Sequence, residues 1–329
     1  MTDTAAPFVI WHFSDGKPGH DNQSRGLLRA LSTRLPVQIH KIDVPPSGKR
    51  TALRHLLDLL RRRCIAPRHL PDPDLLIGTG HATHLPMLAA RHARGGRVIV
   101  LMKPSLPLRC FDLCIVPRHD KVMPRANVFV TRGPLNVIEP AAHKLEHQGL
   151  ILIGGPSKHY RWSDQAVLEQ IEAIARQDTK WRWTLAGSRR TPDSLVTTLR
   201  ERQLPNVSYV AARDTGPEWL PYRIAEAARI WVTEDSLSMI FEALSGGAAA
   251  GLLAVPRRSS DRVTDEMDRL IVDGLLTSHE AWTHGQDLSA PELPLNEAAR
   301  CAQSIVEHFL RVTPPPKSQV PSPSGRGPG

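Results

Sequence analysis

Short apolar runs alternate with amphipathic stretches along most of the chain. In the first part, the pattern predicts strands at 8–13, 37–42, 75–77, 98–102, 113–116 and 128–130. Helices are predicted between them, where apolar residues recur at helical spacing, at 23–35, 51–63 and 85–93. Because strands that alternate with helices are typical of a parallel sheet, we expect a Rossmann-like first domain over residues 1–145.

The second part of the chain repeats this plan. Strands are predicted at 150–153, 181–185, 207–210, 230–232 and 252–255. Helices are predicted at 164–176, 193–202, 222–228 and 263–272. A last helix is predicted at 296–310, and the sequence leaves open which of the two halves it packs on. We therefore expect an α/β fold of two Rossmann-like domains that face each other across a cleft, with a connector at 141–149 and a second domain over 146–312. Residues 313–329 hold six prolines in 17 residues and predict a disordered tail.

The stretch 230–247 places a strand, a polar turn and an amphipathic helix in direct succession. Asp235 or Ser236 is expected to cap the helix, and Ser238 and Glu242 share one helix face. The free N–H groups at such a helix start suit a phosphate, and Glu242 is placed to accept a hydrogen bond from a sugar hydroxyl. The alternative interpretation is an ordinary capped helix.

Both halves open with an apolar strand that runs into a glycine-containing loop. These loops read SDGKPGH at 14–20 and GGPSKHY at 154–160, and the second contains Gly154, Gly155 and Lys158. Small residues there let a ligand approach the backbone. Neither loop is a dinucleotide fingerprint or a Walker loop, and GTG at 78–80 is only a fragment of the former.

A third polar loop, AGSRRTP, follows the predicted strand 181–185 and contains Ser188, Arg189 and Arg190. Arginine binds phosphate oxygens in a bidentate manner, and a neighbouring serine can add a donor. These arginines, Lys158 and the helix starting at Ser236 all follow carboxyl ends of strands, which is the edge where a nucleoside diphosphate would bind.

Composition narrows the class of protein. The 329 residues carry 42 Lys and Arg against 33 Asp and Glu, and a net charge of +9 favours an anionic partner. Neither a signal peptide nor a run of 18 apolar residues is present, so we expect a cytoplasmic protein. The four cysteines are too few and too irregularly spaced for a disulfide framework or a zinc cage.

Four ordered motifs carry a resemblance to a known family: SDGKPGHDNQSRGL, GGPSKHYRW, AGSRRTP and VTEDSLSMIFEAL. Together they resemble the mitochondrial-fission (elongated-mitochondria) family over about residues 11–256. That family is similar to glycosyltransferases of the GT-B type, in which two facing Rossmann-like domains hold a nucleotide-sugar mainly through the second domain. One segment departs from the family: GGAAAGLLAV replaces a glycine followed by a basic residue, proline and valine.

The resemblance implies a role for each residue of the second half. The backbone around Ser236 and Ser238 would hold the diphosphate, assisted by Arg189 and Arg190, and Glu242 would bind the ribose. Such enzymes work without a metal or another cofactor, because a helix dipole and cations stabilise the departing diphosphate. The base that deprotonates the acceptor would come from the first half, and Asp15 and His20 are the candidates.

Three further patterns allow other interpretations. Asp72-Pro-Asp74 matches a metal motif but precedes its strand, and His81 and His84 lack a third ligand at suitable spacing. The basic residues of the segment 49–63 favour an alternative function, a non-enzymatic adaptor that binds a protein partner or an anionic membrane surface. That segment has no aromatic residues, so sequence-specific nucleic-acid binding is not expected.

Overall fold

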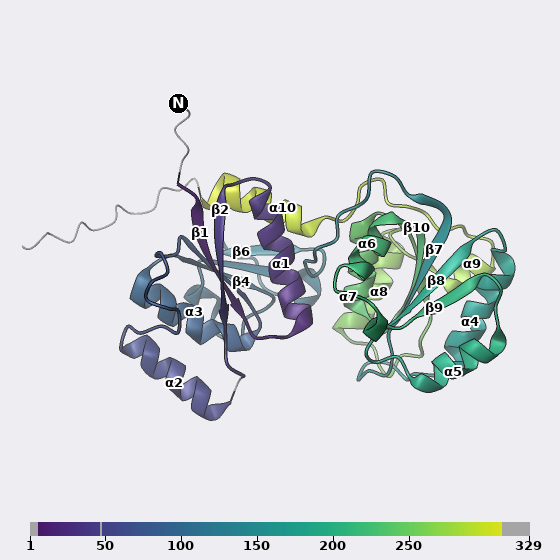
Figure 1. Cartoon of the computed structure of the whole chain (residues 1–329), viewed down its shortest axis with the longest axis horizontal. Coiled ribbons are helices and arrows are strands. Elements are labelled where there is room, and N and C mark those ends of the chain that lie inside the picture. Colours follow the sequence, from purple (N-terminus) through teal and green to yellow (C-terminus); the bar gives the residue numbers. More distant parts are fainter. Residues whose placement is uncertain (1–5, 47, 311–329) are drawn as a thin grey trace, which may run out of the picture.

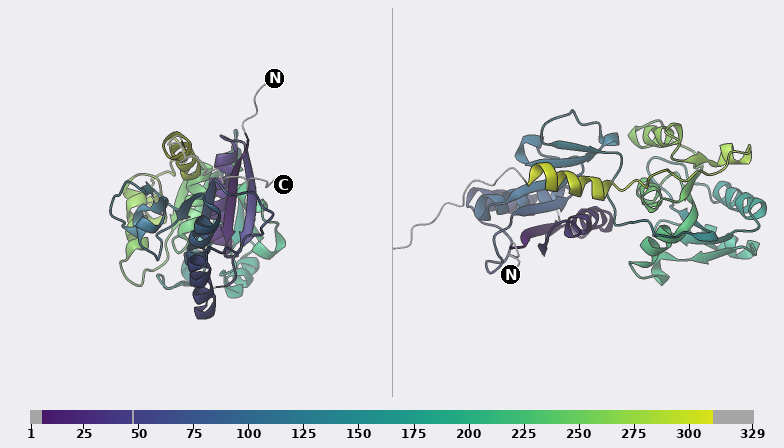
Figure 2. Two further views of the ribbon diagram at one scale, coloured as in Figure 1. Left: turned by 90° about the vertical axis from the view of Figure 1, so that its left-hand side faces the viewer. Right: turned by 90° about the horizontal axis from the view of Figure 1, so that it is seen from above.

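The computed structural model describes residues 6–46 and 48–310, apart from the side chains of Lys49, Arg50 and Ala52. Two α/β domains lie side by side along the long axis of the molecule (Figures 1 and 2). Each is built on one six-stranded sheet whose strands are all parallel. The expected fold class, two Rossmann-like domains in a GT-B-like arrangement, is confirmed. The predicted tail at 313–329 lies outside the described residues.

The first sheet has the strand order β2-β1-β3-β4-β5-β6. Its strands are β1 (Phe8–Ser14), β2 (Val37–Asp43), β3 (Leu75–Thr79), β4 (Arg97–Leu101), β5 (Leu113–Pro117) and β6 (Val128–Thr131). The accompanying helices are α1 (Pro18–Ser32), α2 (Lys49–Leu60) and α3 (His81–Arg94), with short 3-10 turns η1 (Leu108–Cys110) and η2 (Arg118–Asp120). The central strands are apolar on both faces, and two hydrophobic clusters bury them from either side.

The second sheet has the order β12-β11-β10-β7-β8-β9. Its strands are β7 (Leu145–Ile153), β8 (Arg182–Gly187), β9 (Val207–Val210), β10 (Ala227–Thr233), β11 (Ala249–Leu253) and β12 (Thr277–Ser278). The helices are α4 (Asp164–Gln177), α5 (Asp193–Arg202), α6 (Trp219–Glu226), α7 (Leu237–Gly246), α8 (Arg262–Val272) and α9 (His279–Thr283), with a 3-10 turn η3 (Ala212–Asp214). In each sheet the strand order reverses once, between β1 and β3 and between β7 and β10.

The C-terminal helix returns to the first domain. Helix α10 (Glu297–Ser304) continues into a π-helical turn, η4 (Ile305–Phe309). Ala298, Cys301 and Ile305 from this segment join the hydrophobic cluster that contains Ile10 and Leu27, and Figure 2 shows the segment lying on the first domain. The sequence grouped this helix with residues 146–312, but it buries its apolar face in the other domain.

Among the helices whose bounds differ from those that the hydrophobic pattern predicted, α1 and α2 have a clear local cause. Helix α1 begins at Pro18 instead of residue 23, because proline is suited to the first helical position and Asp21 complements the positive helix end. Helix α2 ends at Leu60 instead of residue 63, and Arg62 has a positive φ of 51° that no α-helix tolerates. His20 therefore lies in the first turn of a helix rather than in a loop.

The two domains are joined by ion pairs in addition to the connecting chain. Arg118 of η2 donates from Nε to Oε1 of Glu266 on α8 at 2.7 Å, and Lys121 lies 3.3 Å from Asp265 on the same helix. Glu266 is buried, so the first pair is largely shielded from water. A third ion pair joins the same elements with the charges exchanged, because Arg262 of α8 supplies the cation and Asp120 of η2 the anion.

The chain segment 133–138 passes between α1 and α7 and fixes their approach. A side chain at Gly26 of α1 would lie 2.2 Å from the carbonyl oxygen of Asn136, and one at Gly133 would lie 2.2 Å from the ring of Phe241. Asn136 is buried and donates from Nδ2 to Oγ of Ser245 at 3.0 Å. Because Gly26 and Gly133 have no side chain, the segment 133–138 can pack closely against both helices.

Candidate functional site

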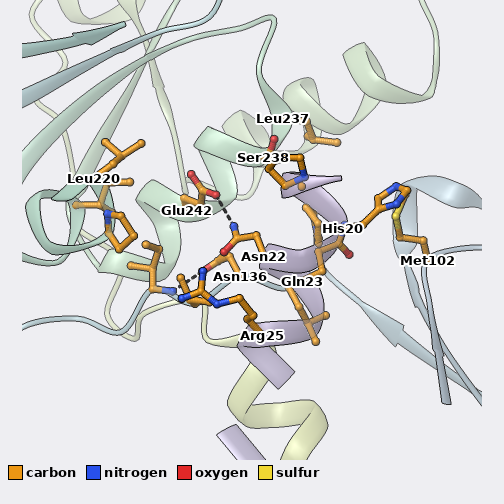
Figure 3. Close-up of a pocket in the computed structure, with 18 of the residues that line it drawn as sticks. His20, Asn22, Gln23, Arg25, Met102, Asn136, Leu220, Leu237, Ser238 and Glu242 are labelled. Atoms are coloured by element: carbon orange, nitrogen blue, oxygen red, sulfur yellow. Dashed lines mark hydrogen bonds between the residues drawn. The ribbon is translucent and has the colours of Figure 1, made fainter. Parts of the chain in front are cut away.

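A cavity of about 570 Å³ lies between the two domains. Its walls come from segments that follow the carboxyl ends of strands in both sheets, which is where open parallel sheets bind ligands. Figure 3 shows α1 on one side of this cavity and α7 on the other. The first domain and the connecting segment contribute Pro18, Gly19, His20, Asn22, Gln23, Arg25, Met102, Pro117, His119, Pro134, Leu135, Asn136, Val137 and Ile138. The second domain contributes Arg189, Pro217, Leu220, Pro221, Ile224, Leu237, Ser238 and Glu242.

The structure pairs the two predicted base residues of the first domain. His20 lies in the first turn of α1, and its Nδ1 is 2.9 Å from Oδ2 of Asp15, which follows β1. The side chain of Asp15 is almost completely buried, whereas His20 reaches the cavity. Because Asp15 holds Nδ1, the other ring nitrogen, Nε2, remains for a partner in the cavity.

The environment of Asp15 keeps its carboxylate charged. Burial raises the pKa of Asp15, but the hydrogen bond and charge of His20, together with the backbone N–H and ammonium of Lys17, outweigh burial and lower the pKa below its usual range. An ionised aspartate stabilises a neighbouring imidazolium. The pair can therefore accept a proton through His20 and hold the resulting charge.

Gly80 makes room for this pair. It follows β3, has a φ of +89°, and a side chain there would lie 2.4 Å from the ring of His20 and 3.2 Å from Asp15. The GTG sequence at 78–80 is thus not the remnant of a dinucleotide fingerprint. Its last glycine gives His20 the space that it occupies at the reversal of strand order between β1 and β3.

In the second domain, Gly154 and Gly155 likewise leave space for neighbouring residues. A side chain at Gly154 would lie 2.3 Å from the carboxylate of Asp235, and one at Gly155 would lie 2.0 Å from the backbone of Arg190. The Gly155 N–H donates to Oδ2 of Asp235 at 3.0 Å. Arg190 lies 2.7 Å from the same carboxylate.

This arrangement explains why the predicted helix cap is wrong. The side chain of Asp235 is 0% exposed and is turned away from α7 toward Gly155 and Arg190. Ser236 takes the N-cap position but makes no side-chain capping bond. The first N–H groups of α7 are therefore not capped by the side chain of Ser236, and they lie at the wall of the cavity, which Leu237 and Ser238 line.

The two arginines of the loop after β8 have different surroundings. Arg190 is held by Asp235 and by the carbonyl oxygen of Gly155, whereas Arg189 lines the cavity. Among the residues that the structure describes, Arg189 has no carboxylate partner, so its charge is available to an anion. Ser188 donates to the carbonyl oxygen of Gly154 at 2.9 Å and thereby fixes the loop.

Of the residues predicted for the site, four line the cavity: His20, Arg189, Ser238 and Glu242. Asp15 stands behind His20. The other residues support this layer from behind or lie outside it, and Lys158 is exposed on its loop. The supporting residues are Gly154, Gly155, Ser188, Arg190, Asp235 and Ser236. The wall opposite α7 is formed by α1, and no residue of the loop 154–160 belongs to the lining.

Glu242 has a partner that the sequence did not reveal. Asn22 of α1 donates from Nδ2 to Oε1 of Glu242 at 2.8 Å (Figure 3). Burial raises the pKa of Glu242 to about 7, and the bond from Asn22 opposes that rise. Near neutral pH the Glu242 carboxyl is therefore present in both its protonated form and its charged form.

Asn22 was not predicted as a lining residue, because the helix was expected to begin at residue 23. Asn22 and Arg25 are three apart and lie on the face of α1 toward the second domain, where Arg25 pairs with Glu218 at 2.8 Å. Proline at the first helical position was the signal that would have extended the helix and placed these side chains together. Met102 lines the same wall with a positive φ of 69°, a conformation that costs energy for a residue with a side chain.

The alternative constellations have structural roles. Asp74 accepts from the N–H of Val9 at 2.9 Å, and Asp72 pairs with Arg94. His84 is buried beside Ser105, and burial lowers its pKa to about 4. Within residues 6–46 and 48–310, no group of three or more His, Cys, Asp or Glu side chains is arranged to hold a metal ion.

No helix in the described part of the chain is both long enough and apolar enough to cross a membrane. The basic segment predicted as an alternative functional surface is α2 with the arginines that follow it. The side chains of Lys49 and Arg50 from that prediction lie outside the description, whereas Arg54, Arg61 and Arg63 are exposed.

Solved structures with the same architecture include two sugar-nucleotide epimerases. The chain is similar to the UDP-GlcNAc 2-epimerase of Methanocaldococcus jannaschii, with a TM-score of 0.57, 12% sequence identity, and 92% of this chain and 99% of that chain covered. It is also similar to the UDP-GlcNAc 2-epimerase of Neisseria meningitidis bound to UDP-GlcNAc, with a TM-score of 0.51, 12% identity, and 93% and 100% of the two chains covered. At these identities the similarity shows a shared fold alone.

Sequence comparison identifies the family. An uncharacterized protein of Rickettsia prowazekii is 22% identical over 371 residues, which cover 92% of this chain and 99% of that relative. Residues 18–309 match the model of the family described as Mitochondrial fission ELM1. This match includes α1, the whole second sheet and α10, so it spans both walls of the cavity. The chain therefore belongs to the mitochondrial fission ELM1 family.

Proposed function

We propose that the cavity between the domains binds a nucleoside-diphosphate sugar and that the protein transfers the sugar to a hydroxyl acceptor without a metal ion. The observation that carries this proposal is the convergence at one wall of three features. They are the start of α7, where Ser236 makes no side-chain capping bond, the cation Arg189, which has no carboxylate partner among the described residues, and the carboxyl of Glu242. A cavity of about 570 Å³ is of the size that such ligands fill.

Each group has a place in the proposed binding mode. The N–H groups at the start of α7 and the guanidinium of Arg189 would receive the diphosphate, because both present positive charge to the same space. Glu242 lies further along α7 and would accept a hydrogen bond from a ribose hydroxyl. The UDP-GlcNAc bound to the similar epimerase of Neisseria meningitidis makes UDP the first nucleotide to test.

The first domain would supply the acceptor side of the reaction. Nε2 of His20 takes the proton from an acceptor hydroxyl, while Asp15 stabilises the imidazolium that forms. The acceptor oxygen forms a bond to the anomeric carbon of the sugar, and the bond from that carbon to the diphosphate breaks. The diphosphate leaves with the bonding electrons and is stabilised by Arg189 and the start of α7.

Calorimetric titration with UDP tests the binding step. Arg189→Gln should weaken UDP binding by about tenfold or more, since a hydrogen bond to a charged group contributes about 1.5–3 kcal/mol. Arg182→Gln is the matched control, because Arg182 is exposed at the opposite, amino end of β8 and does not line the cavity. Equal effects of the two substitutions, or no binding of UDP by wild type, would contradict the proposed ligand.

Turnover is tested separately with UDP-GlcNAc and a mixture of hydroxyl acceptors, by following the release of UDP. His20→Gln should retain UDP affinity and lose most of the release, about 10²-fold or more for a general base. Binding of UDP without any release in wild type would leave the cavity as a nucleotide-binding site and reject the transferase. Formation of an epimeric nucleotide-sugar without UDP release would assign the chemistry to epimerisation instead.

A further inference from the structure

Helix α2 carries a stripe of leucines on the side that faces away from the protein. Leu53, Leu56, Leu57 and Leu60 recur at the spacing of one helix face, and they are between 40% and 72% exposed. The sequence pattern placed these leucines on one face of the predicted helix 51–63. The structure turns it outward, at the edge of the first domain that lies away from the second domain (Figure 1).

The opposite face of α2 anchors the helix. His55 is buried, and Leu59, four residues further, joins the hydrophobic cluster around Trp11 and Leu88. A small rotation of α2 about its axis would not simply bury the leucine stripe, because it would expose His55 and Leu59 at the same time. The other exposed large hydrophobic side chains among the described residues come singly from different elements: Ile39, Met123, Val130, Tyr222, Val272 and Leu293.

Positive charge accompanies this stripe. Between residues 53 and 68 the chain holds five arginines and a single acidic residue, Asp58, which lies 3.8 Å from His55 on the inner side. Arg54 is exposed on α2 itself, and Arg61, Arg62 and Arg63 follow its C-terminal end in an exposed turn. Exposed leucines flanked by arginines are the two components by which an amphipathic helix binds the surface of an anionic bilayer.

We propose that α2 is a peripheral membrane-docking helix, whose leucine stripe inserts among the acyl chains of a bilayer while the arginines contact anionic headgroups. The helix would lie parallel to the membrane plane, because the stripe runs along its length rather than at one tip. The sugar-nucleotide cavity is a separate site, so this proposal does not depend on the proposed function.

Charge and shape favour a lipid surface over other occupants. A second copy of the chain docked about a two-fold axis would bring Arg54 and Arg61 of both copies together, and like charges repel. Nucleic acid would use the arginines but not the four leucines, and the segment has no aromatic side chain for bases to stack on. A peptide partner of the kind that binds a groove finds only the convex face of one helix here.

Vesicle sedimentation of the full chain tests the proposal. Wild type should sediment with vesicles of equal parts phosphatidylglycerol and phosphatidylcholine, and much less with phosphatidylcholine alone or at high salt, because the arginines act through screened charge. The double variant Leu56→Ser/Leu60→Ser should lower the partition coefficient at least about tenfold, since each leucine loses its burial in the bilayer. Arg54→Gln/Arg61→Gln should abolish the preference for the anionic vesicles.

Leu293→Ser is the matched control, because Leu293 is also a highly exposed leucine but lies far along the chain from α2. It should sediment like wild type, and melting curves should show that all variants fold. Equal sedimentation of the double leucine variant and wild type would overturn the proposal. So would a wild-type dimer, seen by light scattering without lipid, that the leucine substitutions convert to a monomer, since the stripe would then bind a second copy.

Discussion

Asn22 on α1 donates a hydrogen bond from Nδ2 to Oε1 of Glu242 on α7 at 2.8 Å. Both residues line the cavity, so this bond joins the two domains at its surface. The residues are 220 positions apart in the chain. Because the carboxyl group keeps a second oxygen, a ligand hydroxyl can bind Glu242 while Asn22 stays in place. A ligand that does so would contact a group whose charge depends on pH near neutrality.

The substitution Glu242→Gln separates ligand binding from folding. Glutamine keeps the carbonyl oxygen that accepts from Asn22, so the bond between the domains should persist. The loss of a charged acceptor should weaken UDP binding by about 1.5–3 kcal/mol. Calorimetric titration measures this loss, and melting without ligand should show no decrease at pH 8. A decrease in melting temperature together with unchanged affinity would make Glu242 a structural residue.

Stability and affinity should respond to pH in opposite directions. The pKa of Glu242 is about 7 in the folded protein and near its ordinary value of 4.5 when unfolded, so the folded state holds the extra proton between these values. The contribution of Glu242 to stability is therefore fully present below pH 4.5 and is lost as the pH rises toward 7. UDP affinity should instead rise over pH 6 to 7, by up to about tenfold, because only the charged form accepts well from the ribose.

The variant Glu242→Gln is the reference for the pH dependence of both the free energy of unfolding and the UDP affinity. Titration of the terminal phosphate of UDP, which has a pKa near 6, is common to both proteins and cancels in the comparison. The difference in free energy of unfolding between wild type and variant should therefore change with pH in urea titrations at pH 5, 6, 7 and 8. Parallel curves for the two proteins would assign the pH dependence to other groups.

The substitution Gly80→Ala tests the space that holds His20. Both Gly80 and Gly95 have a positive φ at the ends of α3, but only at Gly80 would the new carbon meet the His20 ring, at 2.4 Å. Each substitution should destabilise the protein by about 1–3 kcal/mol through backbone strain, because both glycines combine a positive φ with an extended ψ. Gly80→Ala should lose more in urea titrations and should displace the His20 nitrogen resonances in NMR spectra, whereas Gly95→Ala should leave them unchanged. Identical effects of the two substitutions would mean that the His20 site is not packed against Gly80.

Removal of Arg118 should expose the cost of a buried carboxylate at the domain interface. Burial raises the pKa of Glu266, while Arg118 opposes that rise by donating to it. Arg118→Ala should therefore destabilise the protein by about 3 kcal/mol at pH 8. The loss should shrink toward pH 5, since Glu266 without its partner is more easily protonated.

Lys121→Ala is the control for that experiment. Lys121 bridges the same two elements to Asp265 at 3.3 Å, but both side chains are exposed, so its removal should change the free energy of unfolding by less than about 1 kcal/mol. A loss for Arg118→Ala as small as that for Lys121→Ala would show that water reaches Glu266.

The sequence by itself determined the fold class and most of the elements. Strands that are buried on both faces, such as Leu75–Thr79, need continuous apolar runs, and helices beside them need apolar residues at helical spacing, so both leave a pattern in the chain. Gly247 ends α7 with a φ of +74°, a position that glycine favours because it depends on local backbone geometry alone. The motifs that carry the family resemblance were also read directly from the chain.

Only the tertiary structure decided which polar residues face the cavity. Asp235 and Arg190 both follow strand ends, like Arg189 and Ser238, yet the first two bind each other behind the wall. The choice depends on the space left by Gly154 and Gly155, which lie in the loop after a different strand, β7. The partner of Glu242 and the outward turn of the α2 leucines were hidden for the same reason. Contacts between segments far apart in the chain set burial and charge, and such contacts have no local sequence pattern.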